Sequence, residues 1–314
     1  MTKKSHTAKF SYSGKKTKLY AIAKNFDLYL FLLPAVVLTF CFHYIPIYGV
    51  QIAFKNFTPA RGIWASPWVG FTNFVRFFNT YQARVVITNT FFLSLYGIAV
   101  NFPLPVILAL MMNSMANQRF KKTLQTITYM PYFISIVVLV SMVTLFISPT
   151  GLFGNFMRAL GREPQNLLAR PGFFYHAYVW SGAWQGIGWG SIIYLAALSG
   201  VDPTLYEAAT IDGAGKWQKI IHIDIACIAP TCIILLILSA GRVLNIGFEK
   251  AFLMQNPMNL ARSEVINTYI YKVGIQSTQY SFSAAVGLFN NVVNFVILAL
   301  VNWVSGRVSE TSLW

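Results

Sequence analysis

Long apolar stretches alternate with short polar connections along most of the chain. About 20 apolar residues are needed for a helix to cross the hydrocarbon core of a bilayer. Stretches of about that length lie at 28–50, 86–112, 127–148, 176–200, 228–248 and 283–304. The pattern therefore predicts an all-α integral membrane protein with about six transmembrane helices.

The fourth stretch is the least apolar of the six, because it contains the sequence SGAWQGIGWGS. A span interrupted by glycine and polar groups is tolerated only where protein or a water-filled cavity covers the freed backbone groups. Residues 176–200 therefore indicate a place where a polar pathway crosses the membrane.

The composition agrees with a membrane protein. Of the 314 residues, 56% are hydrophobic and 11% are charged, whereas soluble domains carry about 25% charged residues. The net charge is +15, but no basic stripe runs along a soluble domain, so nucleic acid is not an expected partner. The expected partner of the apolar helices is the lipid bilayer.

The first 27 residues form a basic tail with seven lysines and one acid, Asp27. Lys and Arg are enriched in cytoplasmic segments of membrane proteins, so the tail predicts a cytoplasmic N-terminus. It does not read as a cleaved signal sequence. The rest of the chain, 28–314, is expected to form one transmembrane domain, with an external loop at 51–85 and a cytoplasmic loop at 201–227.

Residues that bind metals, phosphates or reacting groups are scattered. The three cysteines, Cys41, Cys227 and Cys232, have no CxxC spacing, and the four histidines are far apart in sequence. The nine acids show no metal-binding or acid–base pattern, and no GxxxxGK[ST] loop is present. We therefore expect no catalytic residue, no metal site and no bound cofactor.

The segment 207–230, EAATIDGAGKWQKIIHIDIACIAP, is unusually polar for this chain. Asp202 and Pro203 are typical of a helix start, so a helix is expected over 203–212. Gly213 permits a bend. Trp217, Ile220, Ile221 and Ile225 then recur at helical spacing on one face. Both a helix lying on the membrane surface and a docking element for a cytoplasmic partner fit this pattern.

Residues in this segment resemble the EAA loop of bacterial ABC importer permeases. The matching residues are Glu207, Ala208, Ala209, Asp212, Gly213, Ala214, Ile223 and Pro230. Ile220 replaces the usual aromatic residue, and Ile225-Ala226 replaces Leu-Pro. The stretches YIPIYGVQIAFKNF, SPWVGFTNFVRFF and QTITYMPYFIS resemble permeases of complex-carbohydrate importers, such as those for alginate and aldouronates.

The resemblance implies a type I importer permease in the bacterial cytoplasmic membrane. In such proteins the EAA loop is a coupling helix that docks on a separate ATPase, which uses ATP and Mg. The implied coupling residues are Glu207, Ala208, Ala209, Asp212, Gly213, Ala214, Trp217 and Ile220. The implied partners are two ATPase subunits, a second permease, expected to differ from this chain, and a solute-binding protein.

Polar and aromatic groups in the last three spans are candidate sugar contacts, and alignment with the maltose importer's larger permease implies such positions in the fourth and fifth spans. The candidate pathway residues are Gln185, Trp189, Ser239, Arg242, Asn245, Asn290 and Asn294. Arg242 is the informative one, because an Arg inside an apolar span is costly and its fork matches a carboxylate. It could instead reach the interface or pair with an acid of a neighbouring subunit. The asparagines could line the passage or join helices.

The expected function is import of an oligosaccharide, with an acidic sugar favoured by Arg242. A neutral oligosaccharide or another solute class is the alternative, since the EAA loop is shared by importers of other solutes. A membrane-embedded transferase would need clustered acids or histidines, which the chain lacks. A secondary transporter would need inverted repeats and intramembrane acids, which are also not found.

Overall fold

Helices form nearly all of the regular structure, as the apolar pattern predicts. The structure, a computed structural model, describes residues 25–308 and 312–313. Within these residues there is no β-strand, and one isolated antiparallel bridge joins Lys55 to Trp68. Residues 1–24, most of the predicted basic tail, lie outside the described part of the chain.

The chain divides into two units, and the first, residues 1–51, is a helix in its described part. Its segments are α2 (Phe26–Thr39), a π-turn (Phe40–Tyr44), α3 (Ile45–Ile47) and the start of a 3-10 segment (Tyr48–Phe54). The wide turn comes just before Pro46, whose ring would clash with the carbonyl of Phe42 in a regular α-helix. The whole helix, 26–54, has the length and hydropathy of a membrane span, as predicted.

The second unit, residues 52–314, begins with a folded connection. It contains the short helices α4 (Gly62–Ala65) and α5 (Thr72–Phe78). The buried Lys55 donates from Nζ to the carbonyl of Ile63 at 2.7 Å, and its Nζ lies 4.7 Å from the centroid of a Trp68 ring. The connection is therefore held by its own polar and aromatic contacts.

Long and short helices fill the rest of the second unit. They are α6 (Tyr81–Asn101), α7 (Pro103–Asn113), α8 (Gln118–Tyr129), α9 (Ile136–Phe146), α10 (Leu152–Ala159), α11 (Pro171–Ser199), α12 (Pro203–Ile211), α13 (Lys216–Lys219), α14 (Ile225–Ala240), α15 (Phe248–Met254), α16 (Leu260–Ser263), α17 (Ile266–Tyr271) and α18 (Tyr280–Val308). Short 3-10 turns lie at Met130–Phe133 and Leu167–Ala169, and π-turns at Ile220–Asp224 and Lys272–Gln276.

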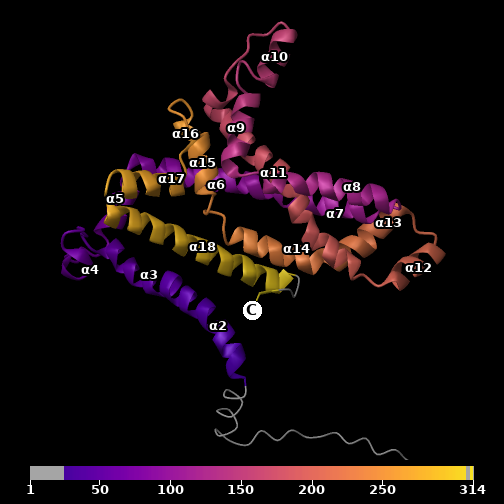
Figure 1. Cartoon of the computed structure of the whole chain (residues 1–314), viewed down its shortest axis with the longest axis horizontal. Helices are drawn as coiled ribbons and strands as arrows, with labels where there is room; N and C mark the ends of the chain where they lie inside the picture. Colours follow the sequence, from indigo (N-terminus) through magenta and orange to yellow (C-terminus); the bar gives the residue numbers. More distant parts are fainter. Residues whose placement is uncertain (1–24, 309–311, 314) are drawn as a thin grey trace, which may run out of the picture. The chain divides into compact units, whose positions relative to one another are not determined.

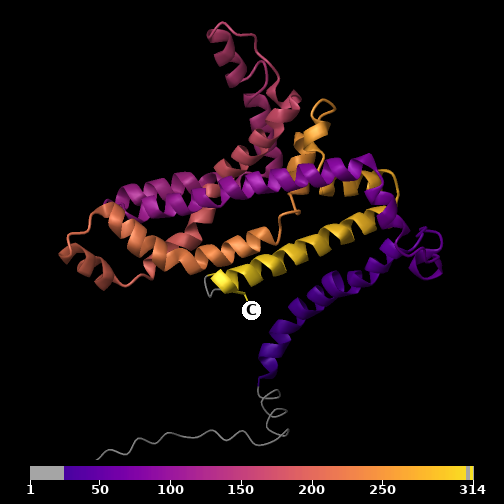
Figure 2. The ribbon, with the colours of Figure 1, turned by 180° about the vertical axis from the view of Figure 1, so that it is seen from behind.

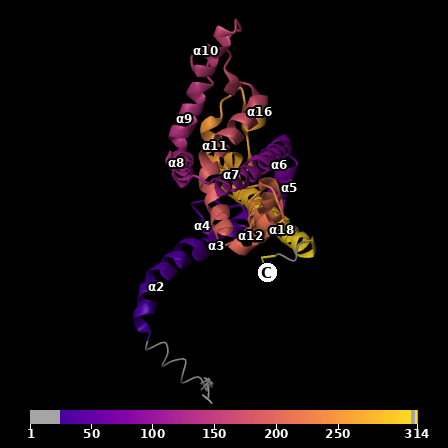
Figure 3. The same ribbon diagram turned by 90° about the vertical axis from the view of Figure 1, so that its right-hand side faces the viewer.

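Helix α11 is the centre of this unit. It contacts α6, α7, α8 and α14, while α14 and α18 lie side by side (Figures 1 and 2). Helices α9 and α10 lead away from this layer, as Figure 3 shows from the side. Three apolar clusters hold the helices together, and α11 contributes buried side chains to two of them, among them Phe174 and Tyr194.

Two of the predicted spans in the second unit are confirmed, and two have different boundaries. The helices 81–113 and 280–308 are long and apolar enough to cross a membrane. The predicted span 127–148 is wrong as a single helix, because the chain bends by 99° between Phe133 and Ile136. The chain follows Pro131 through a 3-10 turn and starts a new helix that Ser135 caps.

The fifth predicted span, 228–248, is also corrected. The apolar helix there runs from Lys216 to Ala240, and Gly241 ends it. A Cβ on Gly241 would lie 2.7 Å from Cδ1 of Leu298, so glycine allows α14 to end in close contact with α18. Residues 241–247 therefore form a non-helical break where the sequence predicts a helix.

The fourth predicted span lies in α11, which is 29 residues long and does not reach the hydropathy of the four apolar spans. Its glycines do not interrupt the helix. A Cβ on Gly188 would lie 2.0 Å from the carbonyl oxygen of Thr128, and one on Gly190 would lie 3.1 Å from Cγ of Pro105. The glycines therefore serve close packing against α7 and α8.

Candidate functional site

The helix expected over 203–212 is present as α12 and ends one residue earlier than predicted, at Ile211. The carboxylate of Asp202 accepts a hydrogen bond from the main-chain N–H of Thr204 at 2.9 Å. This hydrogen bond lowers the pKa of Asp202 below its ordinary value. Helix α12 has no fully buried residue, and most of its surface, except around Tyr206 and Ala209, is exposed.

Gly213 makes the bend that follows α12. Its φ of +77° lies in the left-handed region, where glycine carries no Cβ penalty. The bend is closed by a hydrogen bond from the N–H of Ala214 to the carbonyl of Ala209, at 2.8 Å. The side chain of Gln218 accepts from the N–H of Gly215 at 2.7 Å and so caps α13.

The apolar residues after the bend do not share one exposed face. Trp217 is 77% exposed and Ile221 55%, whereas Ile220 packs inward beside the cluster of Ala109 and Ile228. The π-turn 220–224 adds a residue to the helical turn and changes the register of the face. Ile220 is therefore partly buried beside this cluster, and its part in docking stays a prediction. Glu207 is exposed and forms no ion pair with a described residue.

A buried carboxylate connects α12 to two long helices. Asp224, 3% exposed, accepts hydrogen bonds from the hydroxyl of Tyr206 and from Nδ2 of Asn113, the latter at 3.3 Å. Burial, and then the hydrogen bond to Asp224, raise the pKa of Tyr206 to about 12. The arrangement links α12 to the end of α7 and the start of α14.

The candidate residues around the break 241–247 fall into two groups. Arg242 and Asn245 are exposed, and the side-chain oxygen of Asn245 accepts from Nδ2 of Asn267 at 3.0 Å. The guanidinium of Arg242 has no ion pair or hydrogen bond with a described residue. Since it lies beyond the end of α14, it is not inside an apolar helix as the sequence predicts.

Asn290 and Asn294 belong to the second group and are buried in α18. Oδ1 of Asn294 accepts from the main-chain N–H of Leu244 at 2.9 Å. This bond supplies a partner for a backbone donor that the break leaves without a helical acceptor. Oδ1 of Asn290 has no hydrogen-bond partner among the described residues.

Two further candidates lie on the face of α11 that meets the bend after α8. Gln185 donates from Nε2 to the carbonyl of Ile134 at 2.8 Å. The Trp189 ring stacks on Tyr132 with centroids 4.6 Å apart and also contacts Phe133. Both side chains therefore hold the bend, while Trp189 keeps 44% of its surface exposed.

Two adjoining cavities of about 360 and 150 Å³ lie between α11, α14 and the junction of α6 and α7. Asn101, Pro105 and Gly190 line both. Ser239 lines the larger one, and its hydroxyl donates to the carbonyl of Leu235 at 2.7 Å. Together they form a groove with glycine and polar groups on its walls, which we call the α11 groove.

The seven candidate pathway residues thus lie in three places: the α11 groove, the bend after α8, and the break after α14. The model of the family described as "binding-protein-dependent transport system inner membrane component" matches residues 102–310, which include all seven candidate residues and the α12 segment. The chain belongs to this family.

Similar proteins extend the match over nearly the whole permease. YteP of Bacillus subtilis, a polygalacturonan/rhamnogalacturonan transport system permease protein, is 35% identical over 97% of this chain and 95% of its own length. One chain of a bacterial ABC transporter involved in import of the acidic polysaccharide alginate is 38% identical, with a TM-score of 0.86, over 93% of this chain and 99% of that one. A second structure shows a bacterial alginate ABC transporter in complex with an alginate pentasaccharide-bound periplasmic protein. Its matching chain is 37% identical, with a TM-score of 0.86, over 94% of this chain and 99% of that one.

The family and the fold expected from the sequence are therefore confirmed. The chain is a membrane permease of the type I ABC importer fold, and its relatives are transport subunits, not enzymes.

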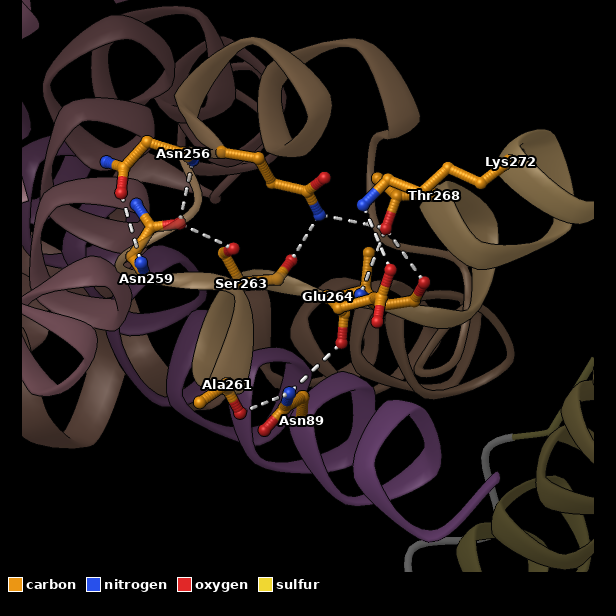
Figure 4. Close-up of polar contacts among 10 residues, drawn as sticks. Asn89, Asn256, Asn259, Ala261, Ser263, Glu264, Thr268 and Lys272 are labelled. Atoms are coloured by element: carbon orange, nitrogen blue, oxygen red, sulfur yellow. Dashed lines mark hydrogen bonds and ion pairs between the residues drawn. The ribbon is translucent and has the colours of Figure 1, made fainter. Parts of the chain in front are cut away.

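Sequence reasoning did not find the polar contacts that position this permease's segments. In Figure 4, Nδ2 of Asn89 donates to the carbonyls of Ala261 and Glu264, each at 3.0 Å. Glu264 pairs with Lys272 at 2.9 Å, the one ion pair between described residues. Ala261 and Glu264 are 172 and 175 positions from Asn89, so no local pattern predicts these contacts.

Lys250 was also missed. This lysine of α15 is 8% exposed, and its Nζ donates to the carbonyl of Tyr178 at 2.8 Å. The signal that could have found it is a lysine two residues beyond the predicted span 228–248. Its burial depends on α15 packing against α11, which the sequence does not predict.

Proposed function

We propose that this permease imports an acidic oligosaccharide. The observation that supports this most directly is 38% identity, over 93% of the chain, to a chain of a transporter involved in alginate import. YteP, named for polygalacturonan and rhamnogalacturonan transport, is similar at 35%. Alginate and polygalacturonan are both carboxylated chains, so the shared chemistry is a uronate.

In the proposed assembly the chain pairs with a second, different permease, and a solute-binding protein delivers the sugar. Two ATPase subunits bind at the cytoplasmic face and use ATP and Mg. The N-terminus is then cytoplasmic, and the connection 51–85 is external. The structure of an alginate transporter with an alginate pentasaccharide-bound periplasmic protein supports the binding-protein part of this proposal.

In this proposal the EAA segment, 207–230, transmits ATP-driven closure of the ATPase subunits to the membrane helices. The free carboxylate of Glu207 would make a charge-assisted contact with a basic ATPase group. Trp217 would supply the apolar contact, and the small Ala208 and Ala209 would permit a close approach. A cavity of about 220 Å³ lined by Asp212, Ala214 and Ala209, among others, would receive an ATPase side chain.

The sugar pathway would use residues from all three places described above. Trp189 offers a half-exposed ring for stacking on a sugar face, and Gln185 and Ser239 offer hydrogen bonds after small local rearrangements. Arg242 would attract a carboxylate from its position in the break, because it has no partner within the described chain. Asn245, Asn290 and Asn294 would shape the passage around it. Binding protein and ATP together would shift the equilibrium between the two access states.

The test is uptake by the complete importer, reconstituted with its own binding protein, of an oligogalacturonate or oligoalginate and of a neutral arabino-oligosaccharide. The proposal predicts ATP-dependent uptake of an acidic chain and little of the neutral one. Preferred uptake of the neutral chain would establish the alternative, a neutral-sugar permease. Arg242→Leu should then reduce acidic uptake more than any residual neutral uptake, and equal losses would leave Arg242 a structural role.

A further inference from the structure

An ammonium group is buried against α11 without an acidic partner. Nζ of Lys250 donates to the carbonyl of Tyr178 and lies 4.7 Å from the centroid of the Tyr178 ring. Lysine has three N–H donors, and this is the one hydrogen bond that its ammonium makes with a described residue. The described chain places no carboxylate within ion-pair distance of it.

Burial of an ammonium without a counter-charge is unfavourable. The carbonyl and ring of Tyr178 offset part of this cost, because both present partial negative charge. They do not neutralise the ammonium. A buried cation with no acid beside it marks a candidate functional site, and the described chain supplies no counter-charge.

The ammonium adjoins the α11 groove. A Cβ on Gly182 would lie 3.1 Å from Nζ of Lys250, so Nζ lies against the surface of α11 at this glycine. Gly182 lines the smaller cavity of the groove together with Asn101 and Gly186. Gly182 therefore lies next to the ammonium and also forms part of the wall of that cavity.

The position of Lys250 is fixed by contacts at the end of its helix. Nδ2 of Asn259 donates to the carbonyl of Met254, the last residue of α15, at 3.0 Å and to the carbonyl of Leu168 at 2.9 Å. Figure 4 shows Asn259 within the polar network that also includes Ser263. The lysine is therefore a cation on a rigid support, which favours specific over diffuse attraction.

We propose that Lys250 binds a carboxylate of the transported sugar as the chain passes along the glycine-lined face of α11. This inference rests on the proposed function, because it requires a carboxylated substrate. The carboxylate offers acceptor oxygens to the two N–H donors that lack partners, and such charge-assisted bonds are about twice as strong as neutral ones. A neutral sugar hydroxyl would not supply the missing charge.

The test compares an oligogalacturonate with the same chain after its carboxylates are reduced to hydroxymethyl groups. Binding to the permease–ATPase complex in nanodiscs, without the binding protein, is measured by equilibrium dialysis. Lys250→Gln can still donate to the Tyr178 carbonyl, so the fold is retained. It should weaken binding of the acidic chain by about tenfold, the loss expected for one hydrogen bond between charged groups, and leave the reduced chain unchanged. Lys250→Arg should restore most of the binding.

Lys272→Met is the matched control, because Lys272 is paired with Glu264 and should not alter the acidic-to-neutral ratio. Equal loss for both chains, or no loss, in Lys250→Gln would overturn the inference. Uptake of the acidic chain with the binding protein present is the second measurement, and wild-type uptake by Lys250→Gln would also overturn it. Failure of the proposed function would give a different result, because the wild-type protein would then show no preference for the acidic chain.

Discussion

Removing the hydroxyl of Tyr206 is the most direct test of how α12 is held to the rest of the permease. Tyr206→Phe removes one donor from the buried Asp224 and leaves it with Nδ2 of Asn113 at 3.3 Å. A hydrogen bond to a charged group contributes about 1.5–3 kcal/mol. We take the lower end, about 1.5 kcal/mol, because Tyr206 is only half-buried and water can replace part of the bond.

That free energy favours the arrangement in which α12 is fixed against α7 and α14. Its loss should lower the affinity of the ATPase for the permease pair about tenfold, since 1.4 kcal/mol is a factor of ten. The assay is titration of purified ATPase onto the permease pair in nanodiscs, together with the ratio of ATP hydrolysed to sugar imported in proteoliposomes. The ratio should rise as coupling weakens.

Two variants sharpen the result. Tyr81→Phe is the matched control, since Tyr81 is 77% exposed and its hydroxyl has no partner among the described residues. In a double-mutant cycle, Tyr206→Phe and Asp224→Asn should be non-additive, because both remove the same contact. Wild-type affinity and coupling ratio in Tyr206→Phe, or additive losses in the cycle, would refute this account of how α12 is held.

Three other substitutions have defined outcomes. Gly213→Ala should destabilise the bend by about 1 kcal/mol, because an L-residue must adopt the left-handed conformation, and should reduce ATP-coupled uptake without loss of membrane insertion. Gly188→Ala places a methyl group 2.0 Å from the carbonyl oxygen of Thr128 and should lower the thermal midpoint of the purified permease, whereas Gly172→Ala, with open space around it, should not. Asn294→Leu leaves a buried N–H in the break without its acceptor and should cost about 1–3 kcal/mol, measured as a lower thermal midpoint; an unchanged midpoint would contradict the role assigned to Asn294.

Much of the architecture could be predicted from the sequence because it depends on local properties. The apolar helices 26–54, 81–113 and 280–308 follow from runs long enough to cross a bilayer. The helix α12 follows from its Asp-Pro start, and the bend from Gly213. These features need only neighbouring residues, so composition and spacing are sufficient to indicate them.

The candidate site was predicted less completely. Arg242 was expected inside a helix, but α14 ends at Ala240, where Gly241 lies close to Leu298 of α18. Ile220 was expected on the docking face, and in the structure it is partly buried against a cluster that includes Ala109 and Ile228. Both positions involve packing against residues distant in sequence, which the local apolar pattern does not show.

The amino-acid sequence by itself therefore determined the membrane class, most of the helices and the EAA segment, because each depends on residues close together in the chain. The tertiary structure alone decided which polar side chains meet. Asp224 joins Tyr206 and Asn113, which is 111 residues away, and Lys250 is buried against Tyr178, 72 residues away. Burial and pairing of charges depend on the packing of distant helices, and it is this packing that gives an ordinary aspartate and lysine their proposed roles.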